Sequence, residues 1–179
     1  DRSMERQEGE SGLVLERVSL SIDDFQVIPE TSIKLPSTES TVIMGPSGCG
    51  KSSFLKMAAG LIVPDTGRVS IFGKDIASLS EAEVEKFRKK NGFVFQDAAL
   101  WQNMTIYQNL ALPLRFHYPD MIEREIRGRV IKMLNSVGVL NQDHLRPAQI
   151  SAGERKLVSF ARAIITEPDL LFLDEPTSF

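Results

Sequence analysis

Residues 45–52 read Gly45-Pro46-Ser47-Gly48-Cys49-Gly50-Lys51-Ser52, which fits the pattern Gly-x-x-x-x-Gly-Lys-Ser of a phosphate-binding loop. The apolar run 41–44 precedes the loop and a helix-like stretch, 52–59, follows it. In such a context the backbone N–H groups and the helix dipole converge on negative charge. Lys51 should reach the β- and γ-phosphates of a nucleotide, Ser52 should ligate Mg²⁺, and Ser53 should complete the contact set.

The composition is that of an ordinary globular domain of 179 residues, with 42% hydrophobic and 25% charged residues and a net charge of −3. Basic residues between 124 and 132 alternate with acidic ones, as on a solvated helix face, so we expect no nucleic-acid partner. The single cysteine, Cys49, excludes an internal disulfide. It is either a reactive thiol at a helix N-terminus or a small residue whose backbone alone binds. No apolar run approaches the roughly 18 residues that span a bilayer, so a partner would provide any membrane part.

Strand-like and helix-like patterns alternate along the chain around a helical insert, which indicates an α/β fold with a mostly parallel core. We expect an antiparallel pair at 13–20 and 26–35, and short, fully apolar strands of the kind found in buried parallel sheets at 92–95 and 170–173. The other expected elements are strands at 41–44 and 68–72 and helices at 51–59, 81–90, 104–112, 121–137 and 153–166.

The apolar strand 170–173 ends in Asp174-Glu175-Pro176-Thr177. At the carboxyl edge of a parallel sheet this pattern places two carboxylates where ligands bind. Asp174 could hold Mg²⁺ through water, and Glu175 could polarise an attacking water. The alternative is a strand that simply ends in an acidic turn.

Two further segments add to this pattern. Gln96 directly follows the strand 92–95, so its amide could meet the metal and the water. The segment Ile150-Ser151-Ala152-Gly153-Glu154 opens a helix and offers N–H groups and a hydroxyl as a second anion site. A second anion site is useful only if two chains face each other.

Taken together, four segments resemble those of an ATP-binding cassette (ABC) transporter ATPase, over about residues 13–179. They are the loop 45–52, Phe95-Gln96, Ile150–Glu154 and Leu170–Thr177. The resemblance implies a P-loop NTPase with a mostly parallel core sheet, an antiparallel β subdomain and a helical insert. It divides the chain into a polar tail (1–12), the N-terminal part of an ATP-binding core (13–96), a helical subdomain (97–150), and a signature helix with the Walker B strand (151–179).

The resemblance also implies ATP and Mg²⁺ as ligands. Glu175, Gln96 and Lys51 would be catalytic, and Ser52, Gln96 and Asp174 would hold the metal. Each ATP would lie between the loop of one chain, residues 45–53, and the second chain's Ser151, Ala152, Gly153 and Glu154 in a head-to-tail homodimer. A membrane-spanning subunit would dock on the segment 100–110, which includes Trp101; the alternative for Trp101 is a core aromatic. The protein would then be peripheral on the cytoplasmic face of the inner membrane.

The chain departs from the family pattern at several positions, among them Leu157 in place of the usual arginine and Ile22 in place of the usual adenine-stacking aromatic. Ala152 replaces the usual glycine and Glu154 the usual glutamine, and both changes should weaken the second half-site. In the family a further strand lies between the Walker B strand and the phosphate-loop strand. We therefore expect the C-terminal part of the core to be missing from residues 1–179, the central sheet to be incomplete and hydrolysis by this stretch alone to be weak.

The leading hypothesis is an ATP-hydrolysing transporter subunit that couples dimer closure to a membrane partner. Within the family, the stretch 95–114 is most similar to lipid-trafficking importers, and lipoprotein-release cassettes are near rivals. The alternative function is a regulatory or structural module that binds ATP but scarcely hydrolyses it. Soluble cassettes acting in translation or DNA repair would carry paired domains or large insertions, and a small-molecule kinase would not carry the signature segment.

Overall fold

The computed structural model describes residues 11–175 of the chain, in two compact units, 1–84 and 85–179. The predicted polar tail 1–12 falls almost wholly outside the described residues, as do Pro176 and Thr177 of the predicted Walker B segment. Each unit is described by itself.

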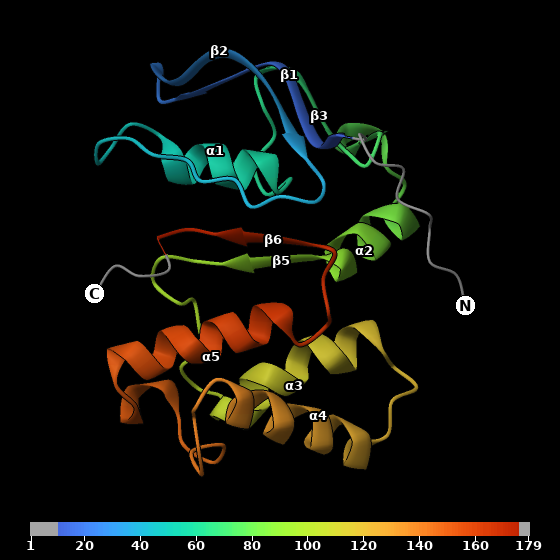
Figure 1. Cartoon of the computed structure of the whole chain (residues 1–179), viewed down its shortest axis with the longest axis vertical. Coiled ribbons are helices and arrows are strands. Elements are labelled where there is room, and N and C mark those ends of the chain that lie inside the picture. Colours follow the sequence, from blue (N-terminus) through green and yellow to red (C-terminus); the bar gives the residue numbers. More distant parts are fainter. Residues whose placement is uncertain (1–10, 176–179) are drawn as a thin grey trace. The chain divides into compact units, whose positions relative to one another are not determined.

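The first unit is built on a four-stranded sheet in the order β2-β1-β3-β4 (Figure 1). Its strands are β1 (Ser11–Ile22), β2 (Phe25–Pro36), β3 (Thr66–Ile71) and β4 (Lys74–Asp75), and all neighbours pair antiparallel. The predicted hairpin between the first two strands is confirmed. Its turn residues Asp23 and Asp24 both have positive φ, which aspartate tolerates better than most residues.

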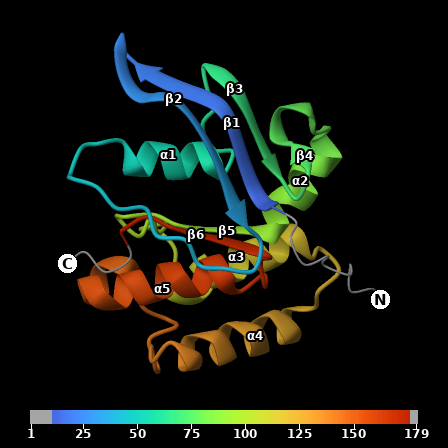
Figure 2. The same ribbon diagram turned by 45° about the horizontal axis from the view of Figure 1, so that its top comes forward.

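Alternating residues of this sheet form the core of the first unit. Leu13 and Leu15 of β1 are buried, as are Val69 and Ile71 of β3, which is the period-two pattern of a strand with one face covered. Helix α1 (Lys51–Ala58) lies beside the sheet (Figure 2) and buries Met57 and Ala58.

The apolar run 41–44 does not form the predicted strand. It is irregular backbone, and the side chains of Val42 and Met44 are 78% and 88% exposed. A strand needs a neighbour for its N–H and C=O groups, and no segment between residues 11 and 175 pairs with this one. Apolar composition favours an extended strand, but it does not supply the partner strand that hydrogen bonding requires.

Helix α2 (Glu81–Lys90) follows β4 and the short 3-10 helix η1 (Ile76–Ser78). Ser80 and Glu83 at its start have the sequence pattern of a capping box, which is half formed. The Glu83 carboxylate accepts from Ser80 N (3.1 Å), but the Ser80 hydroxyl donates to the same carboxylate (2.9 Å) instead of accepting from Glu83 N. These contacts, with Ser80 N first, lower the pKa of Glu83.

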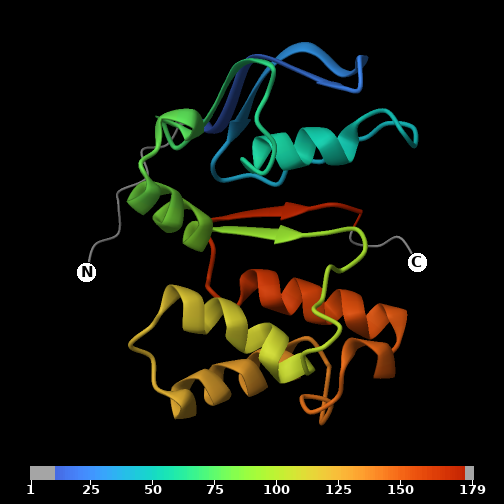
Figure 3. The same cartoon turned by 180° about the vertical axis from the view of Figure 1, so that it is seen from behind.

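Within residues 91–175, the second unit pairs two parallel strands and places helices alongside them (Figure 3). Strands β5 (Asn91–Val94) and β6 (Leu170–Leu173) pair in parallel, as predicted for two buried strands. The helices are α3 (Ile106–His117), α4 (Glu123–Ser136) and α5 (Ala152–Ile164), with the 3-10 helix η2 (Pro147–Gln149) before α5. Helix α3 begins two residues later than predicted and continues through Pro113. Gly138 follows the C-cap residue Val137 of α4 and has positive φ, as is common just after a helix ends.

Apolar stripes of the three helices form the core of the second unit. The stripe residues Leu110, Val130 and Val158, one from each helix, are fully buried in one cluster. None of the helices described between residues 11 and 175 combines the length and the apolar character needed to cross a membrane.

Helix α5 lies directly against β5, and Gly92 makes this close approach possible. A Cβ atom at Gly92 would lie 2.5 Å from the carbonyl oxygen of Ala163 and 2.9 Å from Leu171 Cδ1. The absence of a side chain therefore sets the distance between the strand and the helix.

We predict that Gly92→Ala destabilises the protein and that Gly128→Ala stabilises it. At Gly92 the methyl group meets backbone, so the helix must shift, at a cost of about 1–3 kcal/mol. Gly128 lies inside α4 with open space around it, where alanine is better than glycine by about 0.5–1 kcal/mol. Denaturant unfolding of the two variants measures both values. Equal stability of Gly92→Ala and the unchanged protein would contradict the close contact.

Candidate functional site

The predicted phosphate-binding loop ends at the start of α1, where Gly50 is the N-cap residue with φ 91°. Gly48 also has positive φ (78°), and the space where its Cβ would stand is open. A Cβ at Gly50 would lie 2.9 Å from the carbonyl oxygen of Val27 in β2, so the loop is seated against the sheet. Glycines at these two positions give the turn of backbone that wraps an anion, which fits the predicted role.

Lys51, the first residue of α1, extends over its own loop. Its ammonium donates to the carbonyl oxygens of Gly45 (3.0 Å) and Pro46 (2.8 Å). No side chain caps the N-terminus of α1. A positive charge and helix N–H groups thus lie beside one loop, which is a donor set for phosphate oxygens. Cys49 is exposed within this loop.

The parallel strands β5 and β6 bring the other predicted catalytic residues together in the second unit. Val94 and Leu173 are register partners, and Asp174 N donates to Val94 O (3.0 Å). Gln96 and Glu175 each lie two residues beyond this register pair, and Gln96 Nε2 donates to Glu175 Oε2 (2.9 Å).

Asp174 and Glu175 have different surroundings. Asp174 is 5% exposed, whereas the Glu175 side chain is exposed, so the two neighbouring carboxylates face different environments. The buried carboxylate of Asp174 is suited to holding a metal ion, and the exposed carboxylate of Glu175 is suited to polarising a water molecule.

The predicted metal ligands Ser52, Gln96 and Asp174 come from both units, Ser52 from the first and the other two from the second. Between residues 11 and 175 there is no group of three or more His, Cys, Asp or Glu side chains that could hold a metal ion. Hydroxyl, amide and carboxylate oxygens nevertheless suit a hard cation that keeps several of its waters, such as Mg²⁺.

The predicted signature segment forms the N-terminus of α5. The Ser151 hydroxyl accepts from Glu154 N (3.2 Å), and the Glu154 carboxylate accepts from Ser151 N (2.8 Å), which completes a capping box. Gln142 Nε2 donates to the other oxygen of Glu154 (2.6 Å). These contacts, with Gln142 first, lower the pKa of Glu154. The carboxylate of Glu154 is thus held by the helix start itself, and Ser151 and Ala152 are exposed beside it.

Trp101 lies on the surface with 56% of its area exposed, so it is not a core aromatic. Fully buried Asn109 of α3 holds the loop that carries it. Asn109 Oδ1 accepts from Trp101 N (2.9 Å), and its Nδ2 donates to the carbonyl oxygens of Trp101 (3.1 Å) and Thr105 (3.0 Å). Thr105 in turn caps α3 with Gln108. Trp101 is therefore presented on an ordered loop.

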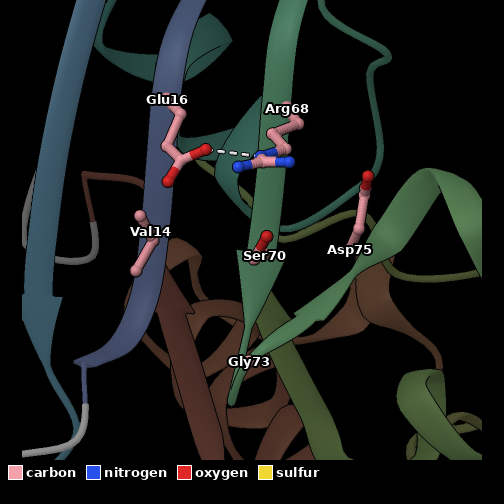
Figure 4. Close-up of a pocket in the computed structure, with 6 residues that line it drawn as sticks. All are labelled: Val14, Glu16, Arg68, Ser70, Gly73 and Asp75. Atoms are coloured by element: carbon pink, nitrogen blue, oxygen red, sulfur yellow. Dashed lines mark hydrogen bonds and ion pairs between the residues drawn. The ribbon is translucent and has the colours of Figure 1, made fainter.

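A cavity of about 360 Å³ lies on the outer face of the antiparallel sheet (Figure 4). Its lining residues come from β1, β3, β4 and the turn at Gly73, and none of them belongs to the loop 45–52. An ion pair between Glu16 of β1 and Arg68 of β3, which face each other in register, crosses the cavity. The hydrogen bond from Arg68 lowers the pKa of Glu16. None of the predicted site residues lines this cavity.

The family model for ABC transporters matches residues 28–178. The chain belongs to the ABC transporter family.

Two curated relatives of this cassette illustrate the match. The sulfate/thiosulfate import ATP-binding protein CysA of Thermosynechococcus vestitus is 38% identical over 166 residues, covering 92% of this chain and 47% of the relative. The probable ribonucleotide transport ATP-binding protein mkl of Mycobacterium leprae is 39% identical over 158 residues, covering 88% and 45%. The chain thus spans about half the length of the curated relatives it matches.

A solved structure has the same fold. The dimeric post-hydrolysis state of the ATP-binding cassette MJ0796, bound to ADP and Pi, superposes with a TM-score of 0.84 at 30% identity, covering 92% of this chain and 74% of that one. The fold predicted for the chain, a P-loop ABC cassette with an antiparallel β subdomain and helices, is thereby confirmed.

The sequence analysis missed two residues of the cassette that connect loops in the second unit, Asn109 and Arg162. Each is a polar residue on the apolar side of a helix: Asn109 lies next to buried Leu110, and Arg162 follows Val158 by one turn. A polar residue at a core position was the available signal.

We predict that Glu154→Gln lowers the thermal midpoint of unfolding at neutral pH. The carboxylate accepts from Ser151 N and Gln142 Nε2 with different oxygens, and an amide has an NH₂ group in place of one of these oxygens. Because the pKa of Glu154 is lowered in the folded protein, its contribution is present above the unfolded pKa and is lost as the pH falls through the folded one. The difference in midpoint should therefore stay constant from neutral pH down to about pH 5 and shrink as the pH falls below about 4, through the lowered pKa.

The control for this prediction is Glu81→Gln, in the exposed first turn of α2. A difference for Glu154→Gln that stays constant with pH would show that its charge has no part in the cap.

Proposed function

We propose that this cassette binds and hydrolyses ATP as part of a transporter subunit. The observation that carries the proposal is the 2.9 Å hydrogen bond between Gln96 and Glu175, beside buried Asp174, at the ends of two parallel strands. An amide, an exposed carboxylate and a buried carboxylate at one sheet edge suit the positioning of water and metal that phosphoryl transfer requires.

In this proposal the loop 45–53 binds the phosphates of ATP through backbone N–H groups, and Lys51 neutralises part of their charge. Ser52, Gln96 and Asp174 hold Mg²⁺, which supplies further charge neutralisation when bound. Glu175 orients and polarises the attacking water, and Gln96 fixes the carboxylate of Glu175 through the hydrogen bond already described.

We further propose a head-to-tail homodimer in which Ser151, Ala152, Gly153 and Glu154 of one chain complete the ATP site of the other. The exposure of Ser151 and Ala152 at the start of α5 supports this, since these residues are accessible to a second chain. The solved relative MJ0796 is dimeric.

The membrane-spanning partner would dock on the ordered loop around Trp101. An exposed tryptophan on a loop held by a fully buried asparagine is a rigid apolar anchor, as in many protein interfaces. The cassette would then lie peripherally on the cytoplasmic face of the inner membrane.

The predicted lipid cargo remains a prediction from the sequence. The two relatives are named for sulfate or thiosulfate and for ribonucleotides, and neither name concerns a lipid. Co-purification of the native complex with its membrane partner, followed by analysis of the bound lipid, tests it.

We predict that Glu175→Gln in the full-length protein retains ATP binding but loses hydrolysis by a factor on the order of 10²–10³. Lys51→Ala should weaken binding itself, because it removes the positive charge beside the loop. Steady-state phosphate release and equilibrium binding of Mg·ATP measure the two effects.

Glu81→Gln serves as the matched control and should leave both quantities unchanged. Hydrolysis within about threefold of the unchanged protein in Glu175→Gln would exclude Glu175 as the base. If the unchanged full-length protein bound ATP without releasing phosphate, the cassette would be a binding module instead.

A second prediction concerns the dimer. Ala152→Gly removes a methyl group from the proposed interface, so ATP-dependent dimerisation of the full-length protein should tighten by about two- to tenfold. Sedimentation with and without Mg·ATP measures it, and a protein that stays monomeric with ATP would contradict the head-to-tail arrangement.

A further inference from the structure

Arg162, on the side of α5 that faces the strands, donates to two neighbouring carbonyl oxygens in the loop after β5. Its Nη1 lies 2.9 Å from Ala99 O and its Nη2 lies 3.3 Å from Ala98 O. In the portion of the chain that the structure describes, it forms no salt bridge with a carboxylate. Burial lowers the pKa of its guanidinium. A half-buried cation that is held by backbone carbonyls alone is an unusual arrangement.

The loop that Arg162 holds has a strained backbone. Ala98 and Ala99 have φ of 65° and 45°, two successive left-handed alanines. An L-residue with a Cβ atom is disfavoured in this conformation, because Cβ lies too close to the following carbonyl oxygen. Such strain persists only where surrounding contacts impose it, and it gathers at functional sites. The carbonyls of these two alanines are the acceptors of Arg162, so the guanidinium is one of the contacts that hold the turn.

The strained turn adjoins the candidate catalytic pair. Gln96 precedes Ala98 by two residues, and the turn is closed by a hydrogen bond from Ala98 N to Phe95 O (3.0 Å). On the other strand Glu175 has positive φ (46°), and its carbonyl oxygen accepts from Lys156 of α5 (3.4 Å). One helix therefore contacts both loops whose side chains meet in the Gln96–Glu175 hydrogen bond.

The position of Arg162 along the strand is fixed by the close packing of α5. The neighbouring residue, Ala163, has its carbonyl oxygen over Gly92, where there is no room for a Cβ atom. The helix cannot slide along β5 without breaking this contact, so the guanidinium stays opposite the turn.

We propose that Arg162 is a positioning residue that holds Gln96, and through it Glu175, in place for hydrolysis by fixing the left-handed turn Ala98–Ala99. The proposal rests on the proposed function, in which Gln96 and Glu175 act in ATP hydrolysis. Arg162 touches neither residue. It acts through two backbone carbonyls.

The test is Arg162→Met in the full-length protein with its membrane partner, because methionine keeps most of the aliphatic stem and removes the donors. The turnover number for ATP should fall on the order of ten- to a hundredfold, the effect of a misplaced catalytic group. The KM for ATP should change by less than about twofold, because the lost contact is to the turn and not to the nucleotide. Amide hydrogen exchange should become faster in residues 96–101.

Two further variants separate positioning from stability. Glycine adopts left-handed backbone without strain, and Ala99 is exposed, so Ala99→Gly leaves no cavity. Added to Arg162→Met, it should restore turnover by about fivefold. Arg129→Met, which removes an exposed arginine paired with Glu125 on α4, is the matched control and should leave turnover unchanged.

Three outcomes would overturn the inference. The first is a turnover number for Arg162→Met that equals that of the unchanged protein. The second is a loss of turnover in Arg162→Met that is fully explained by a smaller folded fraction of the variant. The third is a loss that Ala99→Gly does not repair. Glu175→Gln is measured in parallel. If it retains hydrolysis, the proposed function itself fails, whereas loss of hydrolysis in Glu175→Gln with full turnover in Arg162→Met refutes only the role of Arg162.

Discussion

The parallel pairing of β5 with β6 is the constraint on which the second unit depends. Parallel strands end at the same edge of a sheet, so the residues that follow them meet although they are far apart in sequence. Here the register joins Val94 to Leu173 and carries Gln96 to Glu175, 79 positions away. The same pairing buries Asp174 under the strand ends. The chemistry proposed for these side chains therefore depends on both strands ending at the same edge of the sheet, because neither segment carries all the groups.

Helix α5 adds a second constraint, because it is fitted to β5 by the missing side chain of Gly92. Its N-terminus carries the signature segment, and its Lys156 and Arg162 contact the loops after β6 and β5. A movement of this helix would therefore displace the backbone of both loops. The left-handed backbone at Ala98, Ala99 and Glu175 lies where these contacts are made.

The sequence predicted most of the elements and the grouping of the site, for identifiable physical reasons. The glycines at 48 and 50 mark positive φ, and the short apolar strands mark buried parallel pairing, so the loop and the meeting of Gln96 with Glu175 were accessible from local patterns. The run 41–44 was wrongly predicted as a strand because apolar composition says nothing of whether a partner strand is present. The contacts of Arg162 could not be predicted, since they join residues 63 and 64 positions apart through backbone atoms that every residue has.

The buried amide of Asn109 has a consequence for the chemical ageing of the protein. Its Nδ2 faces three carbonyl oxygens, those of Trp101, Met104 and Thr105, within 3.4 Å. Hydrolysis of this amide to a carboxylate would place an oxygen that repels all three carbonyls, but the reaction needs water, and Asn109 is fully buried. The buried position therefore preserves these donors, and with them the attachment of the Trp101 loop to α3. Deamidation of Asn109 would require a local opening of this loop, so the packing that fixes the exposed aromatic also protects the amide that holds it.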